Sequence, residues 1–421
     1  MNFYKINNSK FKSIYFSFNF TMPVTEKENS ENAVLASVLS KSCQVYKTQK
    51  DIEKFLYNMY GANFDTVVEK YGDLYNIEFR IECINKKFLP NNIDVIGDCL
   101  KFMYEMIFNP NMTDFKFNDE LVDLEKKYIL SRIKERKDDK LQYAVSRTEE
   151  LLTYPQPFGM YVYGDEEKVS KITPEDLCKR YQGMLKNSCI TVIASGNLDG
   201  YTNIEQEIDN IFSNKLNSNL EYSSLIYDTR ICNDITKEVH EITEIQDTVQ
   251  SVITFGLRIK GSKSKMDFYI LNLYNTILGG TPSSKLFTNF REKESLAYTV
   301  RSRYYRYKAI IVIYAGIQKT DYDKAKSVVI KELNEIEIGN ISDEEFNTAK
   351  QSLVADLLDW NDSKIALSKL LLSNILVYKN NNITIDDMIK NIESITKEQV
   401  IDMAKRVELE QILLLGGELD V

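Results

Sequence analysis

The feature that most constrains this chain is a long internal duplication. In the first half, Ile172–Leu177 reads Ile-Thr-Pro-Glu-Asp-Leu and leads to Ile-Ala-Ser-Gly-Asn-Leu-Asp at Ile193–Asp199. In the second half, Ile395–Val400 reads Ile-Thr-Lys-Glu-Gln-Val and leads to Leu-Leu-Gly-Gly-Glu-Leu-Asp at 414–420. Two looser matches keep the same order along the chain: Asn118-Asp119-Glu120 with Ser342-Asp343-Glu344, and Ala62 with Ala297. A repeat of this length predicts two homologous domains.

The seam between the two copies falls in a polar stretch from Ser213 to Thr229. Its Asn217-Ser218-Asn219 and Ser223-Ser224 clusters are typical of a connecting segment. We therefore predict an N-terminal domain at residues 1–215, a linker at 216–229 and a C-terminal domain at 230–421. The division suits the chain length of 421 residues, because domains commonly hold roughly 100–200 residues.

Helix signals are clear at the start of the second copy. A helix is expected to begin after Ser264, which has the residue type of an N-cap and is followed three residues later by Asp267. Apolar residues recur at helical spacing up to Gly279, which is expected to close this helix. A second short helix is expected to open at Pro282, where the missing amide proton has no helical partner to lose.

Strand signals surround these helices. One strand is predicted at 249–257, and segments 298–304 and 309–314 are predicted to pair as antiparallel strands. The run Ile310–Ile313 is apolar on both faces, which indicates that helices cover the sheet. The first copy shows a similar hairpin that turns at Tyr71-Gly72-Asp73. The fold class is therefore α+β, with two homologous domains that each combine an antiparallel-rich sheet with covering helices.

Composition restricts the classes of function. The chain is 43% hydrophobic and 27% charged, as in soluble globular proteins, and no apolar run reaches the roughly 18 residues that a membrane helix needs. Its net charge of -9 argues against a nucleic-acid partner. The N-terminal alternation of Ile14, Phe16, Phe18 and Phe20 with polar residues is typical of a strand and not of a signal peptide.

Six cysteines are scattered without the spacing of metal ligands: Cys43, Cys83, Cys99, Cys178, Cys189 and Cys232. Buried free thiols in a reducing compartment are the simplest interpretation, so we expect a cytoplasmic protein.

The segment Leu278–Phe287, Leu-Gly-Gly-Thr-Pro-Ser-Ser-Lys-Leu-Phe, runs on into Arg291–Tyr298, Arg-Glu-Lys-Glu-Ser-Leu-Ala-Tyr. It resembles the C-terminal-half signature of the pitrilysin/insulinase metallopeptidases, the inverzincins. The resemblance covers nearly the whole chain and implies two domains of the type seen in pitrilysin and the mitochondrial processing peptidase. Within the family the chain is most similar to small, inactive-type bacterial members, including a group associated with the 5-aminopentanol modification of elongation factor P.

In the family that this chain resembles, the N-terminal half holds a catalytic zinc through H-x-x-E-H and a distant Glu. The resemblance places the first motif at about Ala33–Leu39, where this sequence has small and apolar residues. It places the distant Glu near Ser131 and Arg132, and a cation at that point would repel Zn²⁺. Only one histidine, His240, is present. We therefore expect no metal ligands and no cofactor bound by this chain, with zinc held only by a catalytic partner.

The resemblance further implies that Arg291 and Tyr298 bind substrate beside the zinc. A guanidinium and a phenol suit that role, because they can stabilise an oxyanion or hold a peptide backbone. A purely structural alternative has Arg291 cap a helix end and Tyr298 fill a sheet face. Ser295 departs from the family pattern, which has Gly at this position.

Other catalytic motifs are poorly supported. His240 lies in the alternating segment Glu238–Glu241, which is typical of a solvated strand histidine, and the chain has no G-x-S-x-G motif for a triad. No Walker lysine follows a glycine loop, and Gly279-Gly280 is more simply a helix stop.

Three hypotheses of function follow. The leading one is a non-catalytic subunit of a two-chain bacterial zinc metallopeptidase, which supplies Arg291, Tyr298 and a chamber wall to a homologous partner that carries H-x-x-E-H. Its partners would be that subunit, a peptide or unfolded protein substrate, and potentially a second copy of the chain, with no nucleic acid and no membrane span. The alternative is a peptidase-derived scaffold with no role in proteolysis. A third, an independent hydrolase without zinc, lacks a recognisable pair of base and nucleophile.

Overall fold

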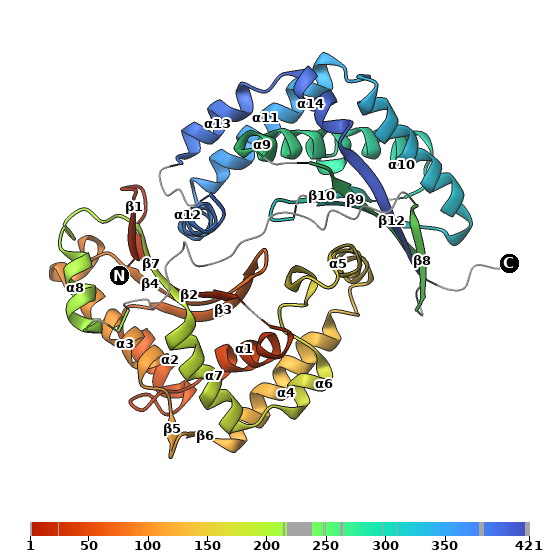
Figure 1. Cartoon of the computed structure of the whole chain (residues 1–421). Coiled ribbons are helices and arrows are strands. Elements are labelled where there is room, and N and C mark those ends of the chain that lie inside the picture. Colours follow the sequence, from red (N-terminus) through yellow and green to blue (C-terminus); the bar gives the residue numbers. More distant parts are fainter. Residues whose placement is uncertain are drawn as a thin grey trace. The chain divides into compact units, whose positions relative to one another are not determined.

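The computed structural model describes residues 2–23, 25–213, 215–216, 238–246, 248, 250–261, 264–297, 299–308, 310–378 and 383–416. These residues form two compact units, each discontinuous in sequence. Unit 1 draws on Met1–Lys134, Met160–Tyr227 and Ser363–Asn381, and unit 2 on Glu135–Gly159, Asp228–Asp362 and Asn382–Val421. Each unit combines a five-stranded sheet with helices (Figure 1).

The sheet of unit 1 has the strand order β1-β7-β2-β4-β3. Strands β1 and β7 pair in parallel, and the remaining pairs are antiparallel. Gly72 turns the β3–β4 hairpin with a φ of 66°, as its sequence predicts. The strand bounds are β1 Asn2–Asn7, β2 Ser13–Pro23, β3 Asn63–Tyr71, β4 Leu74–Ile84 and β7 Cys189–Gly196.

Helices of unit 1 enclose a core that includes the apolar face of β2, where Ile14, Phe16, Phe18 and Phe20 are fully buried. The helix bounds are α1 Glu26–Leu39, α2 Gln49–Asn58, α3 Ile96–Phe108, α4 Asp119–Glu135, α6 Glu166–Lys171, α7 Pro174–Asn187, α8 Ile204–Phe212 and α12 Lys364–Tyr378. A small hairpin, β5 Met112–Thr113 and β6 Lys116–Phe117, precedes α4.

The sheet of unit 2 repeats this topology. Its order is β10-β11-β9-β12-β8, and β8 pairs in parallel with β12 as β1 does with β7. The predicted antiparallel pair is confirmed as β10 and β11. The strand bounds are β8 His240–Ile245, β9 Ser251–Ile259, β10 Val300–Tyr305, β11 Ile310–Ile317 and β12 Val407–Gly416. The predicted α+β class and the duplicated architecture are therefore confirmed.

The helices of unit 2 are α5 Lys140–Thr153, α9 Lys265–Asn275, α10 Tyr322–Glu337, α11 Asp343–Trp360, α13 Ile385–Glu393 and α14 Lys397–Ala404. Ser264 caps α9 as predicted, by accepting a hydrogen bond from the amide of Asp267. No helix among the described parts of the chain is long and apolar enough to span a membrane.

Each half of the sequence contributes one helix to the unit built mainly from the other half. Helix α5 packs on the sheet of unit 2, where Val145 and Leu152 contact the apolar side chains of β11. Helix α12 belongs to unit 1 and lies against β7 and β2. The two units therefore differ from the predicted division into residues 1–215 and 230–421 at the segments that contain α5 and α12. The predicted linker, 216–229, lies outside the described residues except for Leu216.

Beneath α12, the second face of the unit 1 sheet is polar yet buried. Lys364 of α12 forms an ion pair of 2.7 Å with Glu82 of β4, and Lys369 forms one with Glu69 of β3. On the same sheet the hydroxyl of Tyr15 donates a 2.6 Å hydrogen bond to Glu78, which is 2% exposed. The alternating pattern of β2 thus marks an apolar core on one face and a covered polar layer on the other.

Candidate functional site

Helix α1 occupies the position at which the family resemblance placed H-x-x-E-H. It begins with a capping box between Thr25 and Glu28, which satisfies amides that a helix start leaves unpaired. Its C-terminal half is packed into the core of unit 1, with Val34, Leu35 and Val38 at most 1% exposed. The helix is therefore present, but these residues serve packing and offer no metal ligand.

One polar contact joins α1 to α4. The hydroxyl of Ser37 donates a hydrogen bond of 2.5 Å to Oε2 of Glu125, whose side chain is buried. Sequence reasoning missed Glu125, which lies between Val122 and Ile129 on the buried face of α4. The sequence did carry a signal for this residue, because Glu125 recurs at helical spacing with the apolar Val122 and Ile129.

Arg132 lies seven residues beyond Glu125 on α4. Its guanidinium carbon is 5.6 Å from the ring centroid of Tyr163, in a cation–π contact. Zinc prefers thiolate, imidazole and carboxylate ligands, so Ser37 and Arg132 do not fit the metal. Among the residues that the structure describes, no group of three or more His, Cys, Asp and Glu side chains could hold a metal ion.

A second cation is buried against the N-terminal half of α1. Arg180 of α7 is 6% exposed, and its Nε donates to Oδ1 of Asn32 at 2.6 Å. Its Nη1 donates to Oε1 of Glu28 at 2.5 Å. Burial raises the pKa of the nearby Glu31 carboxyl, although the charges of Lys27 and Arg180 act in the opposite direction. This network ties α1 to α7 through a guanidinium.

The Gly-Gly motif of unit 2 forms a π-helix, Thr276–Gly280, directly after α9. The predicted stop at Gly279 is thus replaced by a change of helix type. A Cβ on Gly279 would lie 2.9 Å from Oγ of Ser302 and 3.1 Å from Cδ1 of Leu286. Glycine is therefore required here for the π-helix to approach β10 closely.

The following helix begins at Lys285 and becomes a second π-helix, Phe287–Lys293, so it starts later than Pro282. Leu286 and Phe290 are fully buried. Lys285 is 8% exposed, and its Nζ is 2.9 Å from Oε1 of Glu345, which completes the capping box of α11. Lysine within the signature thus anchors the segment, a role that sequence reasoning did not assign.

Arg291 lies on the second π-helix and is half-buried. Its guanidinium carbon is 4.8 Å from the ring centroid of Phe287, one helical turn earlier. Tyr298 lies outside the described residues. π-helical turns occur frequently at functional sites, which is consistent with a specialised role for this segment.

Ser295 adopts a φ of 52°, in the left-handed region that favours glycine. The main chain here folds back on the π-helix, since the amide of Leu296 donates to the carbonyl of Phe290 at 3.0 Å. Serine therefore occupies a backbone conformation that glycine adopts at lower cost, which agrees with the Gly that the family pattern implied at this position.

Comparisons with known proteins agree with this geometry. A family model described as "Peptidase M16 inactive domain" matches residues 171–353. The "Probable inactive metalloprotease YmfF" of Bacillus subtilis is 25% identical over 412 residues, covering 98% of this chain and 95% of that protein.

Two solved structures share the fold. One, a conserved protein from Enterococcus faecalis V583, has a TM-score of 0.89 at 23% identity and covers 99% of this chain and 96% of that one. The other, described as a peptidase M16 inactive domain from Pseudomonas fluorescens, has a TM-score of 0.76 at 16% identity and covers 99% of this chain and 95% of that one.

The solved structures show that the fold is shared, and the descriptions of the matching family model and of YmfF both contain the word inactive. The chain is similar to inactive-type homologues of the M16 metallopeptidases, through the family model over residues 171–353 and through YmfF over nearly its whole length. The predicted family resemblance is therefore confirmed, and so is the prediction that this chain is a homologue of metallopeptidases, with a relative that is itself described as a "Probable inactive metalloprotease".

Proposed function

We propose that this chain is the non-catalytic subunit of a two-chain zinc metallopeptidase that processes peptides or unfolded proteins. A homologous partner with H-x-x-E-H would hold the zinc. This chain would contribute Arg291 and Tyr298 as substrate-binding residues, together with one wall of the substrate chamber.

One contrast carries the proposal. The two helices where a zinc site would lie lack the ligand residues, whereas the segment that contains Arg291 keeps an unusual backbone. The positions expected to hold ligands carry buried apolar residues and the half-buried Ser37 on α1, and the exposed Arg132 on α4. The Gly-Gly segment keeps an uncommon backbone, with two π-helices and close packing at Gly279. Conformations of this kind persist where the surroundings maintain them, and they cluster at functional sites.

The surroundings of Arg291 support a binding role. Its contact with Phe287 orients the guanidinium while leaving the side chain half-exposed. A planar guanidinium with several donors can hold a peptide carbonyl or stabilise a developing oxyanion.

The test is reconstitution with an H-x-x-E-H homologue from the same organism, measured as kcat/KM on fluorogenic peptides. We expect activity in the mixture and a loss of about a hundredfold with Arg291→Ala, the magnitude typical of a lost oxyanion donor. Lys293→Ala, at an exposed position of the same π-helix, is the matched control and should change little. Unaltered activity with Arg291→Ala and with Tyr298→Phe would refute the substrate-binding role.

A scaffold without a role in proteolysis is the alternative. Leu124 and Tyr128 lie one turn apart on α4 and are 60% and 51% exposed, so this helix presents an apolar strip to solvent. A partner that needs only this strip would bind Leu124→Ser weakly and Arg291→Ala normally.

Two further parts of the proposal concern location and assembly. The five cysteines within the described residues are buried free thiols, which supports a reducing, cytoplasmic setting. We infer pairing with the catalytic homologue in preference to pairing between copies. Sedimentation of the chain alone and of the mixture would decide between these two assemblies.

A further inference from the structure

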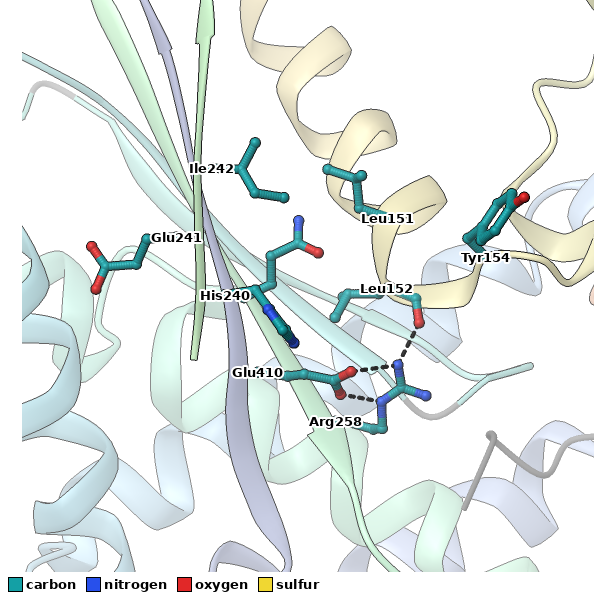
Figure 2. A pocket seen from close by; sticks show the side chains of 9 residues that line it. Leu151, Leu152, Tyr154, His240, Glu241, Ile242, Arg258 and Glu410 are labelled. Carbon is teal, nitrogen blue, oxygen red and sulfur yellow. Dashed lines mark hydrogen bonds and ion pairs between the residues drawn. The ribbon is translucent and has the colours of Figure 1, made fainter. Parts of the chain in front are cut away.

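A pocket of about 460 Å³ lies within unit 2, where the C-terminal end of α5 meets the start of β8 (Figure 2). Its size is within the range of roughly 300–1,000 Å³ that is typical of small-molecule sites. The lining residues come from four parts of the unit: Leu151, Leu152 and Tyr154; His240, Glu241 and Ile242; Arg258; and Glu410 and Gln411.

A β-bulge shapes the floor of this pocket. The pairing of β12 with β9 shifts register between Leu409 and Gln411, so Glu410 is the extra residue. Bulges change the direction of side chains locally and are common beside functional sites. Here the bulge allows two consecutive residues, Glu410 and Gln411, to line the same pocket.

The guanidinium and the two carboxylates that line the pocket all have partners of opposite charge. Arg258 is 5% exposed, and its Nη2 donates to Oε1 of Glu410 at 2.9 Å while its Nε donates to Oε2. Nη2 also donates to the carbonyl of Leu152 at the end of α5 (Figure 2). Glu241 is turned to the other side of β8 and pairs with Lys326 at 2.5 Å. A charged ligand would lose hydration without gaining a counter-charge, so this pocket favours an uncharged one.

Gln411 provides the unsatisfied group. Its side chain is 4% exposed, and Nε2 is buried without a hydrogen-bond partner among the described residues. Such a donor is unfavourable unless something accepts its hydrogen bond. Leu151 and Ile242 line the same pocket, are half-buried and offer apolar surface (Figure 2).

We propose that this pocket binds an uncharged carbonyl group attached to a branched aliphatic group. Nε2 of Gln411 would donate to the carbonyl oxygen, and Leu151 and Ile242 would contact the aliphatic part. A leucine-like residue within a peptide and a small free amide share this chemistry. The inference uses none of the residues assigned to the proposed peptidase subunit, so either can fail without the other.

The test is calorimetric titration of the full chain with N-acetyl-leucinamide. We expect saturable binding to the wild-type chain and a Kd at least about tenfold higher for Gln411→Met, which keeps the length but removes the donor. Gln250→Met, at an exposed position outside the pocket, should bind as the wild type does. Leu151→Trp should abolish binding by filling the space.

Folding of each variant is checked separately by thermal unfolding. Gln411→Met should unfold at no lower temperature than the wild type, because it removes an unpaired buried donor. Titration with acetyl-Ala-Leu-Ala-amide distinguishes the two sources of the ligand. Tighter binding than that of N-acetyl-leucinamide indicates a peptide chain, and equal binding indicates a free amide. The proposal is overturned by no saturable binding in the millimolar range, by equal binding to Gln411→Met, or by tighter binding of the charged N-acetyl-leucine.

Discussion

Ser37 on α1 and Glu125 on α4 are joined by a hydrogen bond of 2.5 Å from hydroxyl to buried carboxylate. These are the two helices on which the family resemblance placed the zinc ligands. In this chain, a direct contact between side chains therefore links them within unit 1. Glu125 lies among apolar neighbours, so the contact satisfies a carboxylate that would otherwise be buried alone.

Ser37→Ala should lower the free energy of unfolding by about 1–3 kcal/mol, because Glu125 would lose its neutral donor while remaining buried. Urea unfolding followed by circular dichroism measures this difference. The matched control is Ser327→Ala on α10, where an exposed serine donates to the carbonyl of Asp323 and a change within about 0.5 kcal/mol is expected. Equal effects at the two sites would show that the link from Ser37 to Glu125 contributes nothing specific.

Metal removal should leave this chain unchanged. Since Ser37 and Arg132 stand at the positions implied for ligands, neither EDTA nor added Zn²⁺ should shift the unfolding midpoint of the chain alone. Differential scanning calorimetry with and without each additive is the measurement. A drop in the midpoint with EDTA, restored by zinc, would reveal a ligand set that the sequence reasoning missed.

Much of the fold was accessible from the sequence because its signals are local or repeated. The duplication predicted two similar sheets, and the turn at Gly72 and the cap at Ser264 fixed the position of particular elements. Both faces of Ile310–Ile313 are buried, as their uniform apolar character indicated.

The exchange of helices could not be predicted, because an apolar face shows that a helix packs without showing on which sheet. In α5 the inward positions Ala144, Thr148 and Leu152 recur at helical spacing, yet they would fit the sheet of either unit equally well. The π-helices were missed for a related reason, since the spacing of apolar residues does not separate one helix type from another.

Glu78 should make stability depend on pH. Burial raises the pKa of its carboxyl above the ordinary value of about 4.3, although the hydrogen bond from Tyr15 acts in the opposite direction. The native state therefore keeps this proton to higher pH than the unfolded chain does. The contribution of Glu78 to stability is full below the unfolded pKa and is lost as pH rises through the native pKa.

Glu78→Gln should remove that loss, because the amide stays neutral and can still accept from Tyr15. The free energy of unfolding of the variant, relative to the wild type, should rise from about pH 4 to about pH 8. Urea titrations at a series of pH values give the difference directly. A difference that falls with pH would mean that the native state binds the charged form better.

Ser295→Gly should stabilise the chain by about 0.5–1 kcal/mol, because a φ of 52° strains any residue with a Cβ. Ser394→Gly is the matched control: its φ of -76° is ordinary, so glycine there adds freedom to the unfolded chain, removes the hydrogen bond from the Ser394 hydroxyl to the carbonyl of Asn391, and should destabilise. Thermal unfolding of both variants tests the sign. Two destabilised variants would argue that the left-handed conformation at Ser295 is not present in solution.

Gly279→Ala should lower the free energy of unfolding by about 1–3 kcal/mol, the usual range for overpacking. The added Cβ would lie 2.9 Å from Oγ of Ser302, whose side chain is buried and donates to the carbonyl of Asn275 at 3.2 Å. Rotation of the Ser302 hydroxyl away from the new Cβ would break its hydrogen bond to Asn275 and would still leave Cβ of Ser302 at 3.1 Å, so the π-helix or β10 must also shift slightly. That shift would also reach the Arg291 segment, and activity of the reconstituted pair should fall beyond the loss of folded protein.

Gly183→Ala is the control for this change. Its Cβ would meet only Nη1 of Arg180 at 3.5 Å, an ordinary van der Waals distance, and it lies inside α7. Alanine is the better helix former there, so this variant should be more stable by about 0.5–1 kcal/mol. Urea unfolding of both variants separates the general effect of alanine from the close approach at Gly279. If Gly279→Ala were as stable as Gly183→Ala, the π-helix would not need glycine to approach β10 closely.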